Sequence, residues 1–233
     1  MTNGSGFSRD SIIARAKAII RDPNAEWPRI AAEQRSITEI FIRYSIPLAA
    51  VGPVAGFLGG QIFGYGMFGI SYRPGLATGL SMAALSFLLS LAGIVILTII
   101  VELLAPKFGG AADRPRAFKL VAYSMTAAAL AGIFGIIPAL AWLGIVGLYS
   151  FYLFYTGVAP MLNIPAEKAA MFTVVTFVCA MLFYLVAGII MGSMGNVIGM
   201  RPGIPTAERM GDSRLAVSDA PALLRGGAES RTY

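Results

Sequence analysis

Long stretches without a charged side chain constrain this chain more than any other feature. Residues 44–65, 76–101 and 170–191 contain no Asp, Glu, Lys or Arg, and the last stretch stays uncharged to residue 200. Each is long enough to cross the hydrocarbon core of a bilayer, which takes about 20 apolar residues in a helix. Charged types make up only 13% of the 233 residues, against roughly 25% in a soluble globular domain. The sequence therefore predicts an α-helical membrane protein.

A fourth uncharged stretch is too long for one crossing. Residues 120–158 number 39 and would form a helix about 58 Å long, nearly twice the roughly 30 Å thickness of the hydrocarbon core. Pro138 lies near the midpoint, where it would interrupt a helix. Two spans joined by a tight turn are therefore predicted. The predicted fold class is all-α, a polytopic membrane helix bundle of about five transmembrane helices.

The positions of Lys and Arg predict the orientation, because cytoplasmic loops carry the excess of these residues. With five spans, one side holds seven basic residues in 1–43, four in 105–119 and Lys168, whereas the loops of the other side hold only Arg73. A cytoplasmic N-terminus is therefore expected. A four-span arrangement would also place the five arginines of residues 201–233 on the cytoplasmic side, but the length of the 120–158 stretch favours five.

Two short amphipathic helices are predicted before the first span. Apolar residues recur at helical spacing within residues 11–21, and Asp22 with Pro23 forms a start signal for a second helix that reaches Ala31. Placement in the membrane interface, with Trp27 as a headgroup-level anchor, is favoured over packing on the bundle or on a soluble partner. The predicted organisation is a cytoplasmic segment (1–43), a five-span transmembrane domain (44–200) and a flexible tail (201–233).

Glycines recur every four residues in two of the predicted spans, at Gly52, Gly56, Gly60 and Gly64 and again at Gly188 and Gly192. Small residues four apart form a groove in which a second helix can approach closely. All six are therefore predicted to pack helices. Packing within the chain is favoured over packing between chains, because a bundle must first pack its own helices.

The sequence excludes several classes of chemistry. The chain has no histidine and one cysteine, Cys179, which leaves no disulfide framework, zinc cluster or histidine catalysis. Residues 64–69 match the three-glycine dinucleotide pattern by letter, but they leave a predicted membrane span instead of joining a strand to a helix, so the match is a coincidence. We therefore expect no enzymatic activity and no cofactor. The net charge of +6 is interpreted as membrane topology and not as affinity for nucleic acid.

A few polar residues keep a transport function open. Gln61 and Asn163 are candidate polar contacts, and Lys168 is a third candidate beside the last span. Pro47 and Pro53 should each free a backbone carbonyl in the first span and kink it. Kinked spans of this kind are found in transporters, although a kink satisfied by neighbouring groups is the commoner case.

Several motifs, taken in order, carry a family resemblance. They are Pro23-x-x-x-Trp27-x-x-Ile30, IPLAAVGPVA at 46–55, Phe108-Gly109-Gly110, FKLVAYS at 118–124, and GLYSFYLFYTG at 147–157 followed by PAEKA at 165–169. Together they resemble the bacterial branch of the Yip family, the Ypt/Rab-interacting membrane proteins, over roughly residues 15–195. The chain departs from the pattern at Ala127, where relatives often have proline, and it lacks the acidic, aromatic signature that eukaryotic members carry before the first span. The resemblance implies a five-span domain with a cytoplasmic N-terminus.

The resemblance says less about activity. Eukaryotic members look like adaptors in vesicle traffic that bind prenylated small GTPases, but the bacterial branch lacks that machinery, so the resemblance transfers no function residue by residue. The leading hypothesis is a non-enzymatic scaffold or adaptor in the bacterial inner membrane. Its expected partners are the lipid bilayer and either other membrane proteins or further copies of itself, bound through packed transmembrane helices. A small transporter or a lipid-handling protein is the alternative, and a regulator of a membrane enzyme is a third possibility.

Overall fold

The computed structural model describes residues 9–67 and 70–197. The chain divides into two units, Met1–Gly192 and Ser193–Tyr233, and the account below concerns the first. The predicted tail at 201–233 lies outside the described residues.

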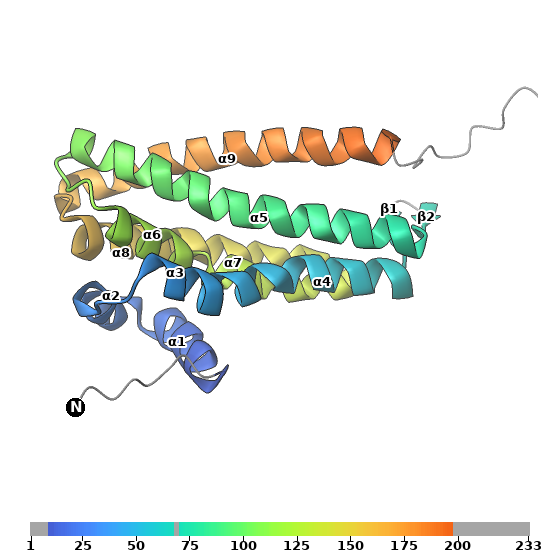
Figure 1. Cartoon of the computed structure of the whole chain (residues 1–233), viewed down its shortest axis with the longest axis horizontal. Helices are drawn as coiled ribbons and strands as arrows, with labels where there is room; N and C mark the ends of the chain where they lie inside the picture. The colour runs from blue at the N-terminus through green and yellow to red at the C-terminus, as the bar shows by residue number, and fades with distance from the viewer. Residues whose placement is uncertain (1–8, 68–69, 198–233) are drawn as a thin grey trace, which may run out of the picture. The chain divides into compact units, whose positions relative to one another are not determined.

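Helices make up nearly all of the first unit (Figure 1). Two short helices precede the spans, one hairpin follows the first span, and several helices change type along their length. In chain order the elements are α1 (Arg9–Arg21), α2 (Pro23–Ala32), α3 (Ile37–Ile40), the π-helical η1 (Phe41–Ser45), α4 (Ile46–Ile62), strands β1 (Tyr65–Met67) and β2 (Ile70–Tyr72), α5 (Leu76–Leu104), the 3₁₀-helical η2 (Ala105–Phe108), α6 (Arg114–Ser124), α7 (Thr126–Ala131), the 3₁₀-helical η3 (Gly132–Ile136) and η4 (Pro138–Leu148), α8 (Tyr149–Leu162) and α9 (Ala166–Val197).

Five helical segments among the described residues are long and apolar enough to cross a membrane. They are Ile37–Ile62, Leu76–Phe108, Arg114–Ile136, Trp142–Leu162 and Ala166–Ile190. The predicted all-α bundle of five spans is thereby confirmed, including the division of residues 120–158. Ile137 is extended, with φ −110° and ψ 111°, so the chain turns at Pro138 as expected. The first span begins earlier than residue 44, because the hydroxyl of Ser36 accepts the Glu39 N–H at 3.1 Å and caps the helix at that point.

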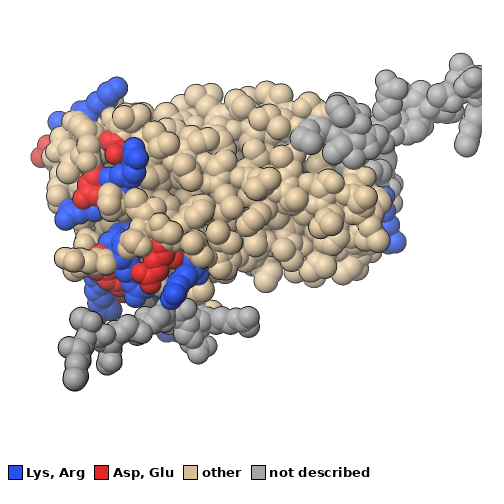
Figure 2. All heavy atoms as spheres, viewed as in Figure 1, with Lys and Arg blue, Asp and Glu red and all other residues tan. Residues whose placement is uncertain are grey.

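Charged side chains gather at one end of the bundle. We call this the charged end; it comprises α1, α2, the connection between α5 and α6 and the first turn of α9, and Figure 2 shows it separated from the opposite end by an uncharged surface. Among the described side chains, Arg73 is the one basic residue at the opposite end, where it follows β2. A bilayer could enclose the uncharged surface without burying a charge.

Close backbone contacts join the first and third spans. A Cβ atom built on Gly132 would lie 2.8 Å from the Gly52 Cα, and one built on Gly59 would lie 2.5 Å from the carbonyl oxygen of Gly135. Real Cβ atoms essentially never come so close, so both positions require glycine. The two backbones approach as small residues allow in membrane helices.

A π-helical turn precedes the first proline of the first span. The Ile46 N–H donates to the carbonyl of Phe41, five residues back. Pro47, the next residue, has no N–H, and in a regular helix its ring would meet the carbonyl of Arg43. The wider turn provides room for this ring, so the irregularity predicted at Pro47 takes the form of η1.

Trp27 fastens α2 to α8. The Trp27 side chain is fully buried, and its indole N–H donates to the Leu153 carbonyl at 3.1 Å and to the Thr156 hydroxyl at 3.2 Å. A Cβ atom on Gly157 would lie 2.6 Å from Trp27 Cε2, so this glycine makes the notch that the indole fills. The prediction of Trp27 as a headgroup anchor is wrong. The alternative of N-terminal helices packed on the bundle is observed instead, because the notch at Gly157 offers both apolar contact and hydrogen-bond acceptors.

Charged groups reinforce this attachment. The Arg15 guanidinium pairs with Glu26 and Glu33 and lies 5.9 Å from the centre of the Tyr123 ring. Burial lowers the pKa of Arg15, but the nearby carboxylates, Glu33 above all, outweigh this effect and raise the pKa above its ordinary value. The Lys119 ammonium donates to the backbone carbonyls of Ile30 and Glu33. Residues of α1, α2 and α6 are thus tied together at the charged end.

Replacing Gly157 with valine should destabilise the bundle. The new side chain would overlap Trp27 and Leu120, whose nearest atoms lie 2.6 Å from a built Cβ, and overpacking of this kind costs about 1–3 kcal/mol. The thermal unfolding midpoint in detergent should fall by a few to about 10 °C. Gly56→Ala is the control, because a Cβ there would meet none of the described atoms within 4 Å. Equal midpoints for Gly157→Val and wild type would contradict the packing described.

Truncating Trp27 should release the N-terminal helices. Trp27→Ala removes a fully buried indole, at a cost of about 3–5 kcal/mol, whereas Trp27→Phe keeps most of the ring and loses only the hydrogen bonds, at about 1 kcal/mol. Trypsin should then cleave after Arg29, whose side chain is 73% exposed, fastest in Trp27→Ala and at an intermediate rate in Trp27→Phe. Unchanged cleavage in Trp27→Ala would show that α2 is held by other contacts.

Candidate functional site

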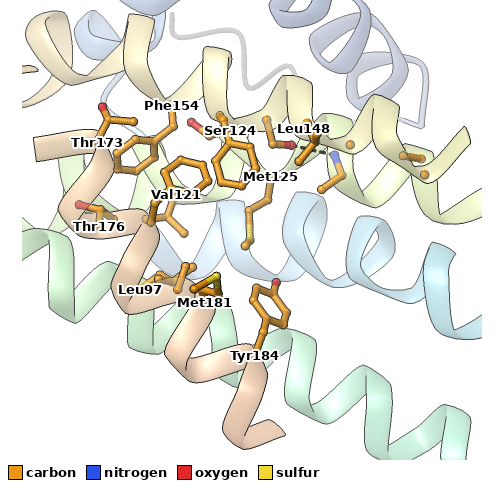
Figure 3. Close-up of a pocket in the computed structure, with 18 of the residues that line it drawn as sticks. Leu97, Val121, Ser124, Met125, Leu148, Phe154, Thr173, Thr176, Met181 and Tyr184 are labelled. Carbon is orange, nitrogen blue, oxygen red and sulfur yellow. Dashed lines mark hydrogen bonds between the residues drawn. The ribbon is translucent and has the colours of Figure 1, made fainter. Parts of the chain in front are cut away.

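A cavity of about 900 Å³ separates much of α9 from its neighbours. Leu97 of α5, Val121 and Ser124 of α6, and Leu148 and Phe154 of the fourth span line one side. Residues of α9 line the other, and Figure 3 shows four of them: Thr173, Thr176, Met181 and Tyr184. The lining is almost entirely apolar. An apolar cavity of this kind excludes water and accepts apolar groups, so its natural contents in a membrane are hydrocarbon chains or side chains.

Two hydroxyl groups beside this cavity have no hydrogen-bond partner among the described residues. They belong to Ser124 and Thr176, which are 3% and 5% exposed. The nearby Thr173 hydroxyl, by contrast, donates to the Ala169 carbonyl at 2.8 Å within its own helix. Sequence reasoning did not single out Ser124 or Thr176. In the sequence, each is marked only by a hydroxyl within an otherwise apolar span. A hydrogen bond from the hydroxyl to a carbonyl of its own helix would explain such a residue equally well.

The last span presents apolar side chains outward along most of its length. Leu185 and Ile189 are 58% and 63% exposed, and Met181, which also lines the open cavity, is 66% exposed. Near its start the helix does pack, because Phe172 is fully buried and its ring contacts those of Phe108 and Phe154. Farther along the helix one side still packs, since Ala187 is buried and Phe183 lies against Gly93, while the other side is exposed.

The six glycines predicted to pack helices have different surroundings. Gly52 faces Gly132 across the contact described above, and Gly60 is buried. Gly64 has φ +75° and ends the first span, where its N–H donates to the Gly60 carbonyl at 3.1 Å. A Cβ atom on Gly56, Gly188 or Gly192 would meet no atom of the described residues within 4 Å. Packing within the chain therefore does not use the surface of α4 at Gly56 or the surface of α9 at Gly188 and Gly192. Packing between chains at these positions stays a prediction.

The three polar candidates do not come together. The Gln61 amide donates to the Pro74 carbonyl at 3.2 Å, which ties the end of the first span to the start of α5. Asn163 has φ +56° and ends α8 in the left-handed conformation, a position that asparagine tolerates better than most residues. Lys168 is exposed in the first turn of α9. Among residues 9–67 and 70–197, no group of three or more His, Cys, Asp and Glu side chains could hold a metal ion.

Removing the Thr176 hydroxyl should not destabilise the protein. Thr176→Val replaces an unpartnered buried hydroxyl with a methyl group of similar shape, and leaving such a hydroxyl buried costs about 1–3 kcal/mol. The unfolding midpoint in detergent should stay constant or rise. Thr126→Val is the matched control, because the Thr126 hydroxyl lies 2.7 Å from that of Tyr44, and it should lower the midpoint. Equal falls in the two variants would show that the Thr176 hydroxyl is bound in the folded protein.

Comparison with known proteins identifies the family. The family model of the Yip1 domain matches residues 17–188, a range that includes both N-terminal helices, from the middle of α1, and nearly all of the five spans. No curated protein matches the chain, and no solved structure matches it. The match covers well over half of the sequence and confirms the resemblance to the Yip family. The chain therefore belongs to the Yip1 domain family of multi-span membrane proteins.

Proposed function

We propose that this Yip1-domain membrane protein is a scaffold or adaptor that binds partner membrane proteins through its transmembrane helices and has no enzymatic activity of its own. Catalytic groups are scarce in the sequence, which has no histidine and a single cysteine. The partner is either another membrane protein or a second copy of this chain. The exposed surface of the last span supports this proposal best.

The observation that carries the proposal is the open glycine pair on α9. Met181, Leu185, Gly188 and Gly192 follow one another at spacings of four, three and four residues, so they form one strip along the helix. Met181 and Leu185 are exposed, and no atom from the described part of the chain lies within 4 Å of a Cβ built on either glycine. Such a strip allows a second helix to pack with its backbone close to that of α9.

The contrast with Gly52 strengthens this interpretation. Gly132 has no room for a side chain, because a Cβ atom there would lie 2.8 Å from the Gly52 Cα. Gly188 and Gly192 have room for larger residues within the chain, so internal packing does not account for them. A binding surface for another helix would account for them.

The charged end is proposed to face the cytoplasm of a bacterial cell, with the protein in the inner membrane. Support comes from the excess of Lys and Arg at this end, which is the pattern of cytoplasmic segments. The helices α1 and α2 would then lie on the cytoplasmic side. They would offer a second binding surface, continuous with the spans to which Trp27 and Arg15 attach them.

A second candidate function, transport or handling of lipids, is favoured by the cavity beside α9. Its volume of about 900 Å³ is at the upper end of the range for ligand sites, about 300–1,000 Å³. Its apolar lining suits a hydrocarbon chain. The two functions differ in what contacts α9 in the membrane: a protein in the first case and lipid alone in the second.

Site-specific crosslinking in native membranes separates these functions. A photo-reactive amino acid at Leu185 should give a protein adduct of defined mass. The same amino acid at Leu88 of α5, which is 61% exposed, should give none. The double variant Gly188→Leu, Gly192→Leu should abolish the adduct at Leu185, because two bulky side chains keep the partner's backbone away. Lipid adducts alone at both positions would refute the scaffold proposal and favour the lipid-handling function.

A further inference from the structure

A second apolar groove lies between the first two spans at the charged end. Its volume is about 470 Å³. Ile37, Phe41 and Ile42 form one wall, Val95 and Ile99 of α5 form the other, and Phe118 and Arg114 of α6 complete the lining. Because Ile42, Val95 and Ile99 are 55%, 45% and 41% exposed, the groove opens sideways, toward the hydrocarbon of a surrounding bilayer. We call it the Arg114 groove.

The groove offers little to a polar ligand along its walls. Thr98 is one of its few polar lining residues, and the Thr98 hydroxyl already donates to the Ile94 carbonyl at 2.7 Å. Water does not fill an apolar space of this kind stably. The part of the occupant that lies along the walls must therefore be a hydrocarbon.

Arg114 gives the groove a positive charge at its rim. The Arg114 side chain is 63% exposed, and its Nε pairs with Glu102 Oε2 at 2.7 Å. A guanidinium has five N–H donors, so this pairing leaves four for another acceptor. In the connection that leads into α6, Lys107 is exposed, whereas Arg116 pairs with Asp113 and Lys119 is bound to the carbonyls of Ile30 and Glu33. Arg114 therefore provides the rim with its N–H donors for an anion.

The shape and position of the groove favour an acyl chain as its occupant. A helix is about 10 Å across, whereas an acyl chain is much narrower and can lie between α5 and residues 37–46, which form the longest wall. The polar head of a phospholipid lies at the level where the charged end begins. Basic pockets between transmembrane helices are known to hold anionic lipid headgroups.

From these observations we propose that the Arg114 groove binds an anionic phospholipid, with an acyl chain between α5 and the first span and the phosphate on the Arg114 guanidinium. The site is separate from the α9 strip, so this inference does not rest on the proposed scaffold function. The bound lipid would bridge the first three spans and fill space that their own side chains leave open.

Native mass spectrometry of the full chain in mild detergent tests the proposal. The protein would be titrated with phosphatidylglycerol, which is anionic, or phosphatidylcholine, which is zwitterionic with the same chains. Wild type should retain phosphatidylglycerol preferentially. Arg114→Gln should weaken this binding about tenfold, as expected for the loss of a charge-assisted hydrogen bond, and bring it to the level of phosphatidylcholine. Arg29→Gln is the matched control, because Arg29 also pairs with a glutamate, Glu26, but lies on α2 and does not line the groove.

Filling the groove provides an independent test of the acyl-chain position. Val95→Trp and Ile42→Trp introduce bulk from opposite walls and should each reduce binding of both lipids. The unfolding midpoint without added lipid shows whether each variant folds. Two variants are used so that the test survives if one of them does not fold. The proposal is overturned if Arg114→Gln and a folded groove-filling variant bind phosphatidylglycerol as wild type does. It is also overturned if wild type does not distinguish the two lipids, or if Arg29→Gln loses as much binding as Arg114→Gln.

Discussion

The cost of placing charge in hydrocarbon is the constraint on which this structure depends. It confines the basic residues of the described bundle to one end, with Arg73 as the exception at the other. It also explains why ion pairs such as those of Arg15 with Glu26 and Glu33, and of Arg114 with Glu102, occur at the charged end. Between the two ends, helices pack mostly through shape, with a few hydrogen bonds such as that between the hydroxyls of Tyr44 and Thr126. The close approach of Gly52 to Gly132 and of Gly59 to the Gly135 carbonyl is the result in the first and third spans.

The charged end and the spans form one structure because Trp27 joins them. A buried indole that donates to Leu153 and Thr156 of α8 holds α2 against the bundle, and the Arg15 and Lys119 contacts extend the attachment to α1 and α6. Under the scaffold proposal, a partner bound to α9 within the membrane and a partner bound at the charged end would thus share one rigid support. The two apolar spaces, beside α9 and at Arg114, have different chemistry, since Arg114 places a cation at the rim of the smaller one.

The sequence predicted what depends on charge and length, and it did not predict what depends on shape. Uncharged length and Pro138 were enough to give five spans and the turn between the third and fourth. The predicted position of Trp27 was wrong, because tryptophan suits both a headgroup layer and a buried notch. The notch exists only in the folded bundle, where Gly157 of α8 faces the Trp27 indole. Spacing by four pointed to Gly52 and Gly56, whereas the close contacts with the third span use Gly52 and Gly59, seven residues apart. The cavity beside α9 could not be predicted, because the α9 sequence is apolar on all sides and no sequence pattern marks the side that lines the cavity.

The membrane topology of the charged end is the central claim, and cysteine labelling in sealed vesicles tests it most directly. In a Cys179→Ala background, single cysteines would replace Ala112 and Lys168 at the charged end and Arg73 and Ala139 at the other; all four positions are exposed. A membrane-impermeant maleimide should label Ala112→Cys and Lys168→Cys from one side only, and Arg73→Cys and Ala139→Cys from the other side only. Labelling of Ala139→Cys from the same side as Ala112→Cys would mean that the third span does not cross the membrane and would contradict the five-span account.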